Sequence, residues 1–143
     1  MGSGHDVCTT LGPVSAGLKG VLEEADPELF LAKVIGKTIT ERESTRLVLF
    51  CDKEYELVLL AWPPDFQSPV HDHGSSCGAV RVLKGNALEQ EFAGVESGAE
   101  RLHRQEFHAG EIVEMVEGHI HSFGNASSSN WMYSLHLYSP PIV

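Results

Sequence analysis

Two histidines separated by one residue, His71 and His73, form the pair in this chain best suited to bind a metal. They stand in the stretch 68–78, which has the character of a strand followed by a glycine-rich segment. Successive side chains of a strand alternate between its faces, so His71 and His73 point to one side and Asp72 points to the other. Two imidazoles on one face of a strand can bind the same metal ion. An exposed polar strand would show the same alternation, so the interpretation depends on further ligands downstream.

Candidates for a third ligand are His119 and His121, and by residue type either one would serve. Three neutral imidazoles that leave neighbouring positions open suit a divalent metal that must also bind a substrate. By donor chemistry alone, iron, zinc, copper and nickel are all admissible.

A row of polar side chains near the C-terminus forms a second candidate feature. Ser134, His136 and Tyr138 alternate with Leu135 and Leu137, so the three polar residues share one face of a strand. A surface strand would explain this pattern. Inside a barrel, hydroxyls and imidazoles persist only when they are hydrogen-bonded, and the row would then be a relay.

The elements that must position these residues are mostly strands. Two short helices are expected at 17–25 and 26–36, the second with Asp26 as N-cap, Pro27 in its first turn and Gly36 at its end. Short strand-like runs separated by turn signals then follow at 45–51, 55–62, 69–73, 79–84, 87–92, 101–107, 111–115, 121–125 and 131–138. Many short strands without intervening helices predict an antiparallel sandwich or barrel.

We expect one mainly β domain over 1–143, with a helical part at about 14–36 and a β-barrel at about 45–143. Its interior is predicted from the apolar residues Val80, Val82, Leu88, Phe92, Ile112, Val113 and Val116. Trp62, Phe92 and Trp131 are interpreted as packing residues, and His103 and His108 as solvent-facing.

Charge and composition exclude several classes of partner. The net charge is -10 with only ten basic residues, so we expect no nucleic-acid partner and no anionic membrane surface. No apolar run approaches the roughly 18 residues of a membrane span, and the first residues lack the layout of a secretory signal, so a soluble cytoplasmic protein is expected. The three cysteines are scattered without a C-x-x-C motif, which argues against disulfides and thiolate zinc.

From about residue 45 onward the chain resembles the cysteine dioxygenases, which are thiol dioxygenases of the cupin superfamily. The resemblance rests on four motifs, of which the last is the most specific: His71-Asp72-His73, Val82-Leu83-Lys84-Gly85-Asn86, His121 with Gly124-Asn125, and Ser134-Leu135-His136-Leu137-Tyr138-Ser139-Pro140-Pro141. It implies a cupin (RmlC-like jelly-roll) β-barrel after short N-terminal helices. It also implies that His71, His73 and His121 hold a mononuclear Fe(2+) ion, with His119 outside the ligand position.

The same resemblance implies a reaction and the residues that serve it. The substrates would be L-cysteine and dioxygen, and the product cysteine sulfinic acid. Arg46 matches the arginine that holds the substrate carboxylate, a task suited to a planar donor fork. Tyr138 matches the tyrosine whose hydroxyl faces the substrate and oxygen, and His136 and Ser134 match the residues that orient it.

Two positions depart from the family pattern. Animal members link a cysteine to the active-site tyrosine, but here Gly78 occupies that position and Cys77 stands one residue earlier. We therefore predict no Cys-Tyr crosslink, as in bacterial relatives, and an inert Cys77. Ser44 replaces a tyrosine that often helps to bind the carboxylate, which bears on substrate affinity more than on reaction type.

Three alternatives remain open at this point. A 3-mercaptopropionate dioxygenase is the rival enzyme, although its family members replace the arginine at the position of Arg46 by glutamine. A non-catalytic metal-binding cupin that acts as a sensor is the alternative of a different class. Arg46 itself could instead form a surface ion pair with Glu41, Glu43 or a neighbouring carboxylate. The chain is expected to be a monomer or a weak homo-oligomer.

Overall fold

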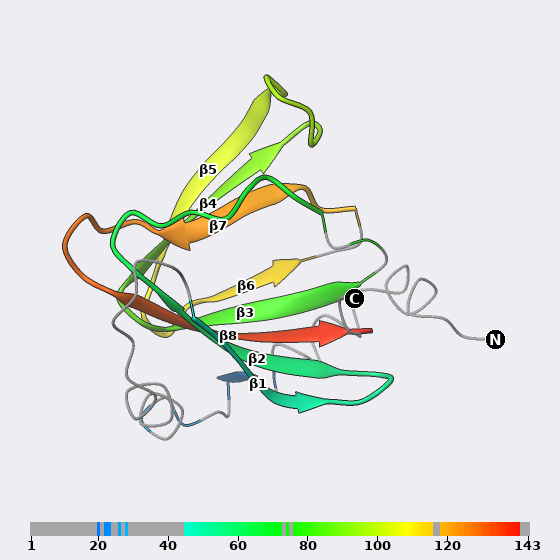
Figure 1. The fold of residues 1–143 in the computed structure, drawn as a ribbon, viewed down its shortest axis with the longest axis vertical. Helices are drawn as coiled ribbons and strands as arrows, with labels where there is room; N and C mark the ends of the chain where they lie inside the picture. Colours follow the sequence, from blue (N-terminus) through cyan, green and yellow to red (C-terminus); the bar gives the residue numbers. More distant parts are fainter. Residues whose placement is uncertain are drawn as a thin grey trace.

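The computed structural model describes residues 20, 22, 23, 26, 28, 45–72, 74, 76–115 and 118–140. Eight strands lie in this part of the chain (Figure 1): β1 (Thr45–Cys51), β2 (Glu56–Trp62), β3 (Cys77–Lys84), β4 (Asn86–Phe92), β5 (Arg101–His108), β6 (Ile112–Met115), β7 (His121–Asn125) and β8 (Met132–Ser139). The mainly β fold predicted from the sequence is confirmed. No helix of the described residues is long and apolar enough to cross a membrane.

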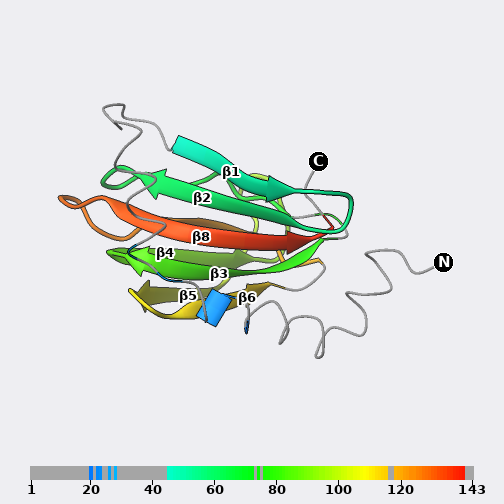
Figure 2. The same cartoon turned by 90° about the horizontal axis from the view of Figure 1, so that it is seen from below.

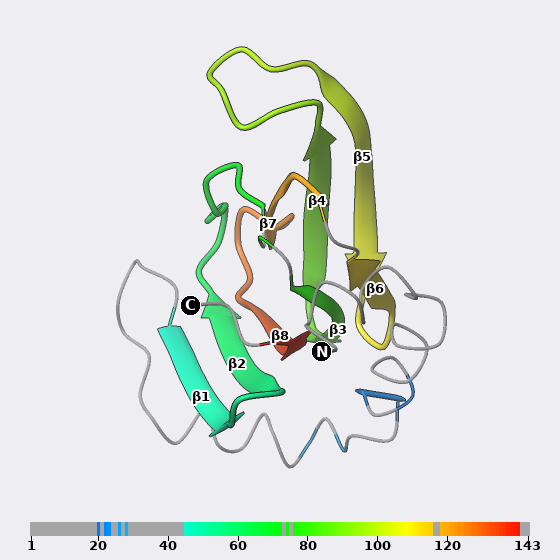
Figure 3. The ribbon, with the colours of Figure 1, turned by 90° about the vertical axis from the view of Figure 1, so that its right-hand side faces the viewer.

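The strands form two antiparallel sheets. The larger has the order β1-β2-β8-β3-β6, which Figure 2 shows in succession, and the smaller has the order β5-β4-β7. In Figures 1 and 3 the hairpin of β4 and β5 rises beyond the other strands. Both sheets contribute to one apolar cluster, which contains Trp62 and Val80 from the larger sheet and Ala87 and Phe123 from the smaller. This cluster marks the interior between the sheets.

The outer face of the larger sheet carries a second apolar cluster. Leu135 and Leu137 of β8 belong to it, whereas Tyr138 belongs to the interior cluster, as the alternation in the sequence predicts. Leu22, one of the described helical residues, is fully buried in the outer cluster. Arg81 Nη1 donates to the carbonyl oxygen of Leu22 at 2.8 Å. The remaining residues of the two predicted helices lie largely outside the described part.

Three sequence expectations about the interior are wrong. Ile112 is only partly buried and packs against the outer cluster. Leu88 and Phe92 are only partly buried, because the inner positions of β4 are Ala87 and Glu89, which are buried. Glu89 pairs with Phe123 of β7. The interior face of this strand therefore carries a carboxylate. Val116, another predicted interior residue, lies outside the described part.

The predicted strand at 69–73 is also wrong, since the described residues there form only an isolated bridge at His71. Pro69 has no N–H to donate to a ladder. Beyond His71 the chain turns: Asp72 Oδ1 accepts a hydrogen bond from the Gly74 N–H at 2.8 Å, and Gly74 has a φ of 61°. The turn ends the pairing after a single bridge.

The segment that carries His71 runs along β7. Gln67 forms a bridge with Gly124, and His71 forms one with His121. The Asn125 N–H donates to the Phe66 carbonyl and the Ser68 N–H to the Phe123 carbonyl, both at 2.9 Å. A Cβ atom on Gly124 would clash with the Phe66 carbonyl oxygen and lie 2.7 Å from Gln67 Cα. Glycine at 124 therefore permits the approach that brings His71 to β7.

We expect Gly124→Ala to destabilise the fold by about 2 kcal/mol or more, because the added methyl group meets backbone atoms that cannot rotate away. Thermal and urea unfolding would measure the loss. Gly98→Ala is the control, since Gly98 has a φ of 84° with nothing within 4 Å of its added Cβ, and strain alone should cost about 1 kcal/mol. Equal losses in the two variants would contradict the proposed close approach.

Candidate active site

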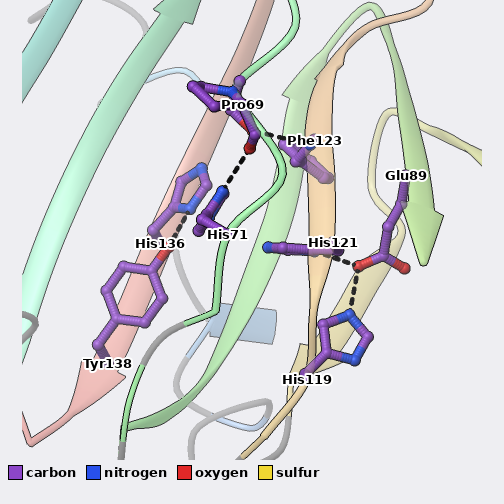
Figure 4. A network of polar contacts seen from close by, with 9 residues as sticks. Pro69, His71, Glu89, His119, His121, Phe123, His136 and Tyr138 are labelled. Carbon is purple, nitrogen blue, oxygen red and sulfur yellow. Dashed lines mark hydrogen bonds and ion pairs between the residues drawn. The ribbon is translucent and has the colours of Figure 1, made fainter. Parts of the chain in front are cut away.

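His71 and His121 form the centre of the candidate site. Each N–H donates to the other's carbonyl at 2.9 Å, so the two residues are directly paired and their side chains lie on one face. The ring centroids are 4.9 Å apart, with the rings edge to face (Figure 4). His121 is buried and His71 is partly buried. His73 lies outside the described residues.

The protonation of both rings follows from their partners. His71 Nδ1 lies 2.7 Å from the Pro69 carbonyl oxygen, and His121 Nδ1 lies 2.7 Å from Glu89 Oε2. Both oxygens only accept, so each Nδ1 is the donor, and the neutral form of each ring has its lone pair on Nε2. In Figure 4 the Nε2 side of His121 is turned toward His71. Burial lowers the pKa of His121, although the hydrogen bond to Glu89 raises it in part. The lowered pKa keeps the His121 ring neutral.

Glu89 of β4 orients His121, and sequence reasoning missed it. Its Oε2 accepts hydrogen bonds from His121 Nδ1 at 2.7 Å and from His119 Nε2 at 3.0 Å. Burial would raise the pKa of Glu89, but the two hydrogen bonds outweigh it and lower the pKa to about 2. In the sequence the residue stands in the polar run Glu89-Gln90-Glu91, where alternation gives no sign of which side chain is buried.

His119 pairs with the same carboxylate from the loop before β7. Burial alone would lower its pKa, but the hydrogen bond and charge of Glu89 raise it. The ligand atoms of Glu89, His119 and His121 lie within 4.8 Å of one another, which makes this trio a second possible metal position. Glu89 Oε2 lies at hydrogen-bond length from both nitrogens, as a single acceptor between two donors does. We therefore interpret Glu89 and His119 as supports of His121.

The polar row of β8 lies on the interior face and is fully connected. Ser134 Oγ lies 2.6 Å from His136 Nε2, and His136 Nδ1 lies 2.9 Å from the Tyr138 hydroxyl. All three residues are buried, so the alternative of a surface strand is wrong. Trp62 of β2, interpreted from the sequence as a packing residue, also donates its indole N–H to Ser134 Oγ at 2.8 Å. In Figure 4 His136 and Tyr138 lie on the side of His71 opposite His121.

Comparison with known proteins decides the family. The family model described as cysteine dioxygenase type I matches residues 35–143. The chain belongs to the cysteine dioxygenase type I family. Human cysteine dioxygenase type 1 is 29% identical over 94 residues, which are 62% of this chain and 46% of the human protein. The chain thus spans about half the length of that relative.

Solved structures confirm the cupin fold. A protein from Bacillus halodurans is similar with a TM-score of 0.61 and 18% identity, covering 76% of this chain and 78% of its own. An RmlC-like cupin with a double-stranded β-helix fold from Methanocaldococcus jannaschii gives a TM-score of 0.57 and 14% identity, covering 72% and 85%. At these identities the likeness establishes the fold alone.

Arg46, which the sequence predicts to hold a substrate carboxylate, is itself paired with a buried carboxylate. Its Nη2 lies 2.5 Å from Glu56 Oε2; the Arg46 side chain is 50% exposed and that of Glu56 is 7% exposed. Glu56 stands opposite Tyr138 in the pairing of β2 with β8. An ion pair with a neighbouring carboxylate was one alternative for Arg46. The other carboxylates considered, Glu41 and Glu43, and the departure at Ser44 lie outside the described part.

The charges of Arg46 and Glu56 affect the pKa of Tyr138. Burial raises the pKa of Tyr138 well above its usual range; Arg46 lowers it in part and Glu56 raises it further. The phenol is therefore protonated at any physiological pH.

Gly78 and the preceding residue, Cys77, have different partners on β8. Gly78 stands opposite Tyr138, and a Cβ on Gly78 would lie 2.6 Å from Tyr138 Cδ1. Glycine thus gives the ring its space. Cys77 stands opposite Ser139, and its Sγ contacts the Ser139 carbonyl oxygen at 3.5 Å. The buried Cys77 thiol therefore contacts the residue after Tyr138 in the sequence.

The remaining sequence candidates lie away from this site. His103 and His108 are exposed on β5, as predicted. His108 Nδ1 contacts Asn86 Oδ1 at 2.8 Å.

We expect Glu89→Gln to weaken the binding of a divalent metal, with ferrous iron as the probe, by about 10- to 100-fold, because the charged acceptor that orients His121 is lost. Equilibrium dialysis under nitrogen would measure this affinity. Glu91→Gln is the control: Glu91 stands opposite His121 on the same strand as Glu89 and adds negative charge near His119, but it hydrogen-bonds to neither histidine of the trio.

His119→Gln distinguishes the two possible metal positions. If His119 only supports Glu89, this variant should bind the metal nearly as well as the parent protein, whereas His71→Gln should bind it much more weakly. The reverse order would place the metal at Glu89, His119 and His121.

Proposed function

We propose that this protein is a non-haem iron thiol dioxygenase that oxidises L-cysteine with dioxygen to cysteine sulfinic acid. The observation that carries the proposal is the paired His71 and His121, facing one space beside the buried Tyr138 relay. Membership of the cysteine dioxygenase type I family supports the same reaction. The reaction balances without a further reductant, since both oxygen atoms of dioxygen are transferred to the thiol sulfur.

We propose His71, His73 and His121 as the ligands of a mononuclear Fe(2+) ion. The two described members fit, because each fixes its proton on Nδ1 and so keeps the Nε2 lone pair for a metal. Ferrous iron held there would supply the oxygen chemistry and favour the thiolate form of the substrate.

Tyr138 is the proposed proton-bearing group of the site. His136 fixes the position of its hydroxyl, and burial keeps the hydroxyl protonated. A positioned hydroxyl can donate a hydrogen bond to a substrate sulfur or oxygen at the moment charge develops there. A binding site that only senses a ligand needs no such relay, which favours an enzyme over a sensor.

Arg46 supports cysteine as the substrate. Glu56 engages one nitrogen of the Arg46 guanidinium and leaves other donors of the fork for a carboxylate. Cysteine and 3-mercaptopropionate both carry such a carboxylate, and cysteamine lacks it. An arginine at position 46, where the 3-mercaptopropionate dioxygenases have glutamine, favours cysteine over 3-mercaptopropionate.

The test is oxygen uptake and sulfinate detection by mass spectrometry after anaerobic loading with ferrous iron. Cysteine, 3-mercaptopropionate and cysteamine are assayed in parallel, and cysteine should be the preferred substrate. Arg46→Gln should raise the KM for cysteine by about tenfold or more, the loss expected for a charge-assisted hydrogen bond. Arg101→Gln, at an exposed arginine of β5, should not change it.

Two outcomes would contradict this proposal. Turnover of 3-mercaptopropionate alone would assign the rival dioxygenase activity. A metal-loaded protein that consumes no oxygen with any of the three thiols would be the non-catalytic sensor.

Tyr138→Phe should lower kcat by about 10²- to 10⁴-fold while ferrous iron binds as before, because only the hydroxyl is removed. Steady-state kinetics and metal analysis measure the two properties separately. Tyr133→Phe is the matched control on the same strand, since Tyr133 packs against the outer cluster. In the parent protein the raised pKa of Tyr138 predicts no rate change from phenol ionisation below about pH 10. Unchanged turnover in Tyr138→Phe would remove the tyrosine from the mechanism.

A further inference from the structure

Trp62 stands at the inner end of the relay that leads to Tyr138. Its indole nitrogen lies 2.8 Å from Ser134 Oγ, and the chain of contacts continues through His136 to the tyrosine hydroxyl. All four residues are buried, and Trp62 is only 5% exposed. The contacts therefore form one line of hydrogen bonds shielded from solvent.

The chemistry of the indole gives this line a direction. An indole N–H can only donate, so Ser134 Oγ accepts from Trp62. The hydroxyl has a single proton, and its other side-chain contact among the described residues is His136 Nε2, at 2.6 Å. That proton therefore goes to His136, because a fully buried hydroxyl proton without an acceptor is costly.

The direction passes on to the tyrosine. His136 Nε2 accepts, so the proton of the neutral ring is on Nδ1, and Nδ1 donates to the Tyr138 oxygen. The Tyr138 oxygen accepts this bond, so its own proton points away from His136. In the opposite direction the tyrosine would donate to His136 and turn its proton away from the substrate.

We propose that Trp62 is a positioning residue whose indole N–H fixes the His136 tautomer and so directs the Tyr138 hydroxyl proton into the site. The value of this direction for catalysis depends on the proposed dioxygenase function. The direction itself depends only on the four side chains and exists without metal or substrate.

Packing makes the indole N–H separable from the ring. Trp62 contacts Phe66, Phe123 and His136 with ring centroids 6.0, 5.6 and 6.4 Å away. Trp62→Phe keeps an aromatic ring among these partners and removes the donor. Trp131→Phe is the matched control, because Trp131 stacks on Tyr133 at the outer cluster.

The test is nitrogen NMR of the metal-free protein labelled with ¹⁵N-histidine, with the His136 signals assigned by loss in His136→Gln. The parent protein and Trp131→Phe should show His136 with its proton on Nδ1. Trp62→Phe should show a mixture of tautomers or the proton on Nε2. Ser134→Ala breaks the same line and should give the same change, so the proposal remains testable if Trp62→Phe does not fold.

Two NMR results would overturn the proposal: a proton on Nε2 of His136 in the parent protein, or an unchanged Nδ1 tautomer in both Trp62→Phe and Ser134→Ala. Kinetics then test the catalytic consequence. Trp62→Phe should lower kcat by about tenfold or more, with little change in KM. The loss should not exceed the loss in Tyr138→Phe, which removes the hydroxyl itself. An altered tautomer with unchanged kcat would also overturn the positioning role. A parent protein that turns over no thiol would refute the dioxygenase function and leave the tautomer result standing.

Discussion

The two backbone hydrogen bonds between His71 and His121 are the constraint on which the rest of the site depends. They join a segment outside the strands to β7, and direct pairing places both imidazoles on one face. The contact requires the chain at Phe66 and Gln67 to lie against Gly124, where any side chain would collide with backbone. Rings 50 residues apart in sequence thus meet because one glycine allows two stretches of backbone to touch.

The hydrogen-bond networks buried on the two sides of this pair lie on different sheets. Glu89 of the smaller sheet holds His121 from one side. On the other side, β8 of the larger sheet supplies the line from Ser134 to Tyr138. Buried imidazoles, carboxylates and hydroxyls are stable only when each finds a partner, so both networks fix side-chain orientation as well as position. The site is therefore complete only when the two sheets pack together.

The sequence predicted those features that depend on local alternation and missed those that depend on pairing between distant strands. The row of β8 was predictable because Leu135 and Leu137 mark its other face. Glu89 was not, since its neighbours in the run are polar on both faces of β4. The strand expected at 69–73 followed from alternation alone, which does not distinguish a ladder from a single bridge. The partner of Arg46 depends on the register of β1 with β2, which shifts between Val48 and Phe50 and leaves no local signal.

Because Gly78 stands where some family members have the crosslinked cysteine, the orientation of the Tyr138 hydroxyl depends on hydrogen bonds. A family member with a cysteine linked to the tyrosine fixes that ring by a covalent bond. Here the Tyr138 ring lies against the bare backbone of Gly78, and the Cys77 thiol contacts the carbonyl of Ser139. The orientation of the hydroxyl then depends on the non-covalent contacts of Tyr138, among which the bond from His136 has a direction. A histidine can hold its partner as donor or acceptor with little change in geometry, so position alone does not determine where the tyrosine proton points. The group that does determine it must be unable to reverse, and within the described relay the indole of Trp62 has that property.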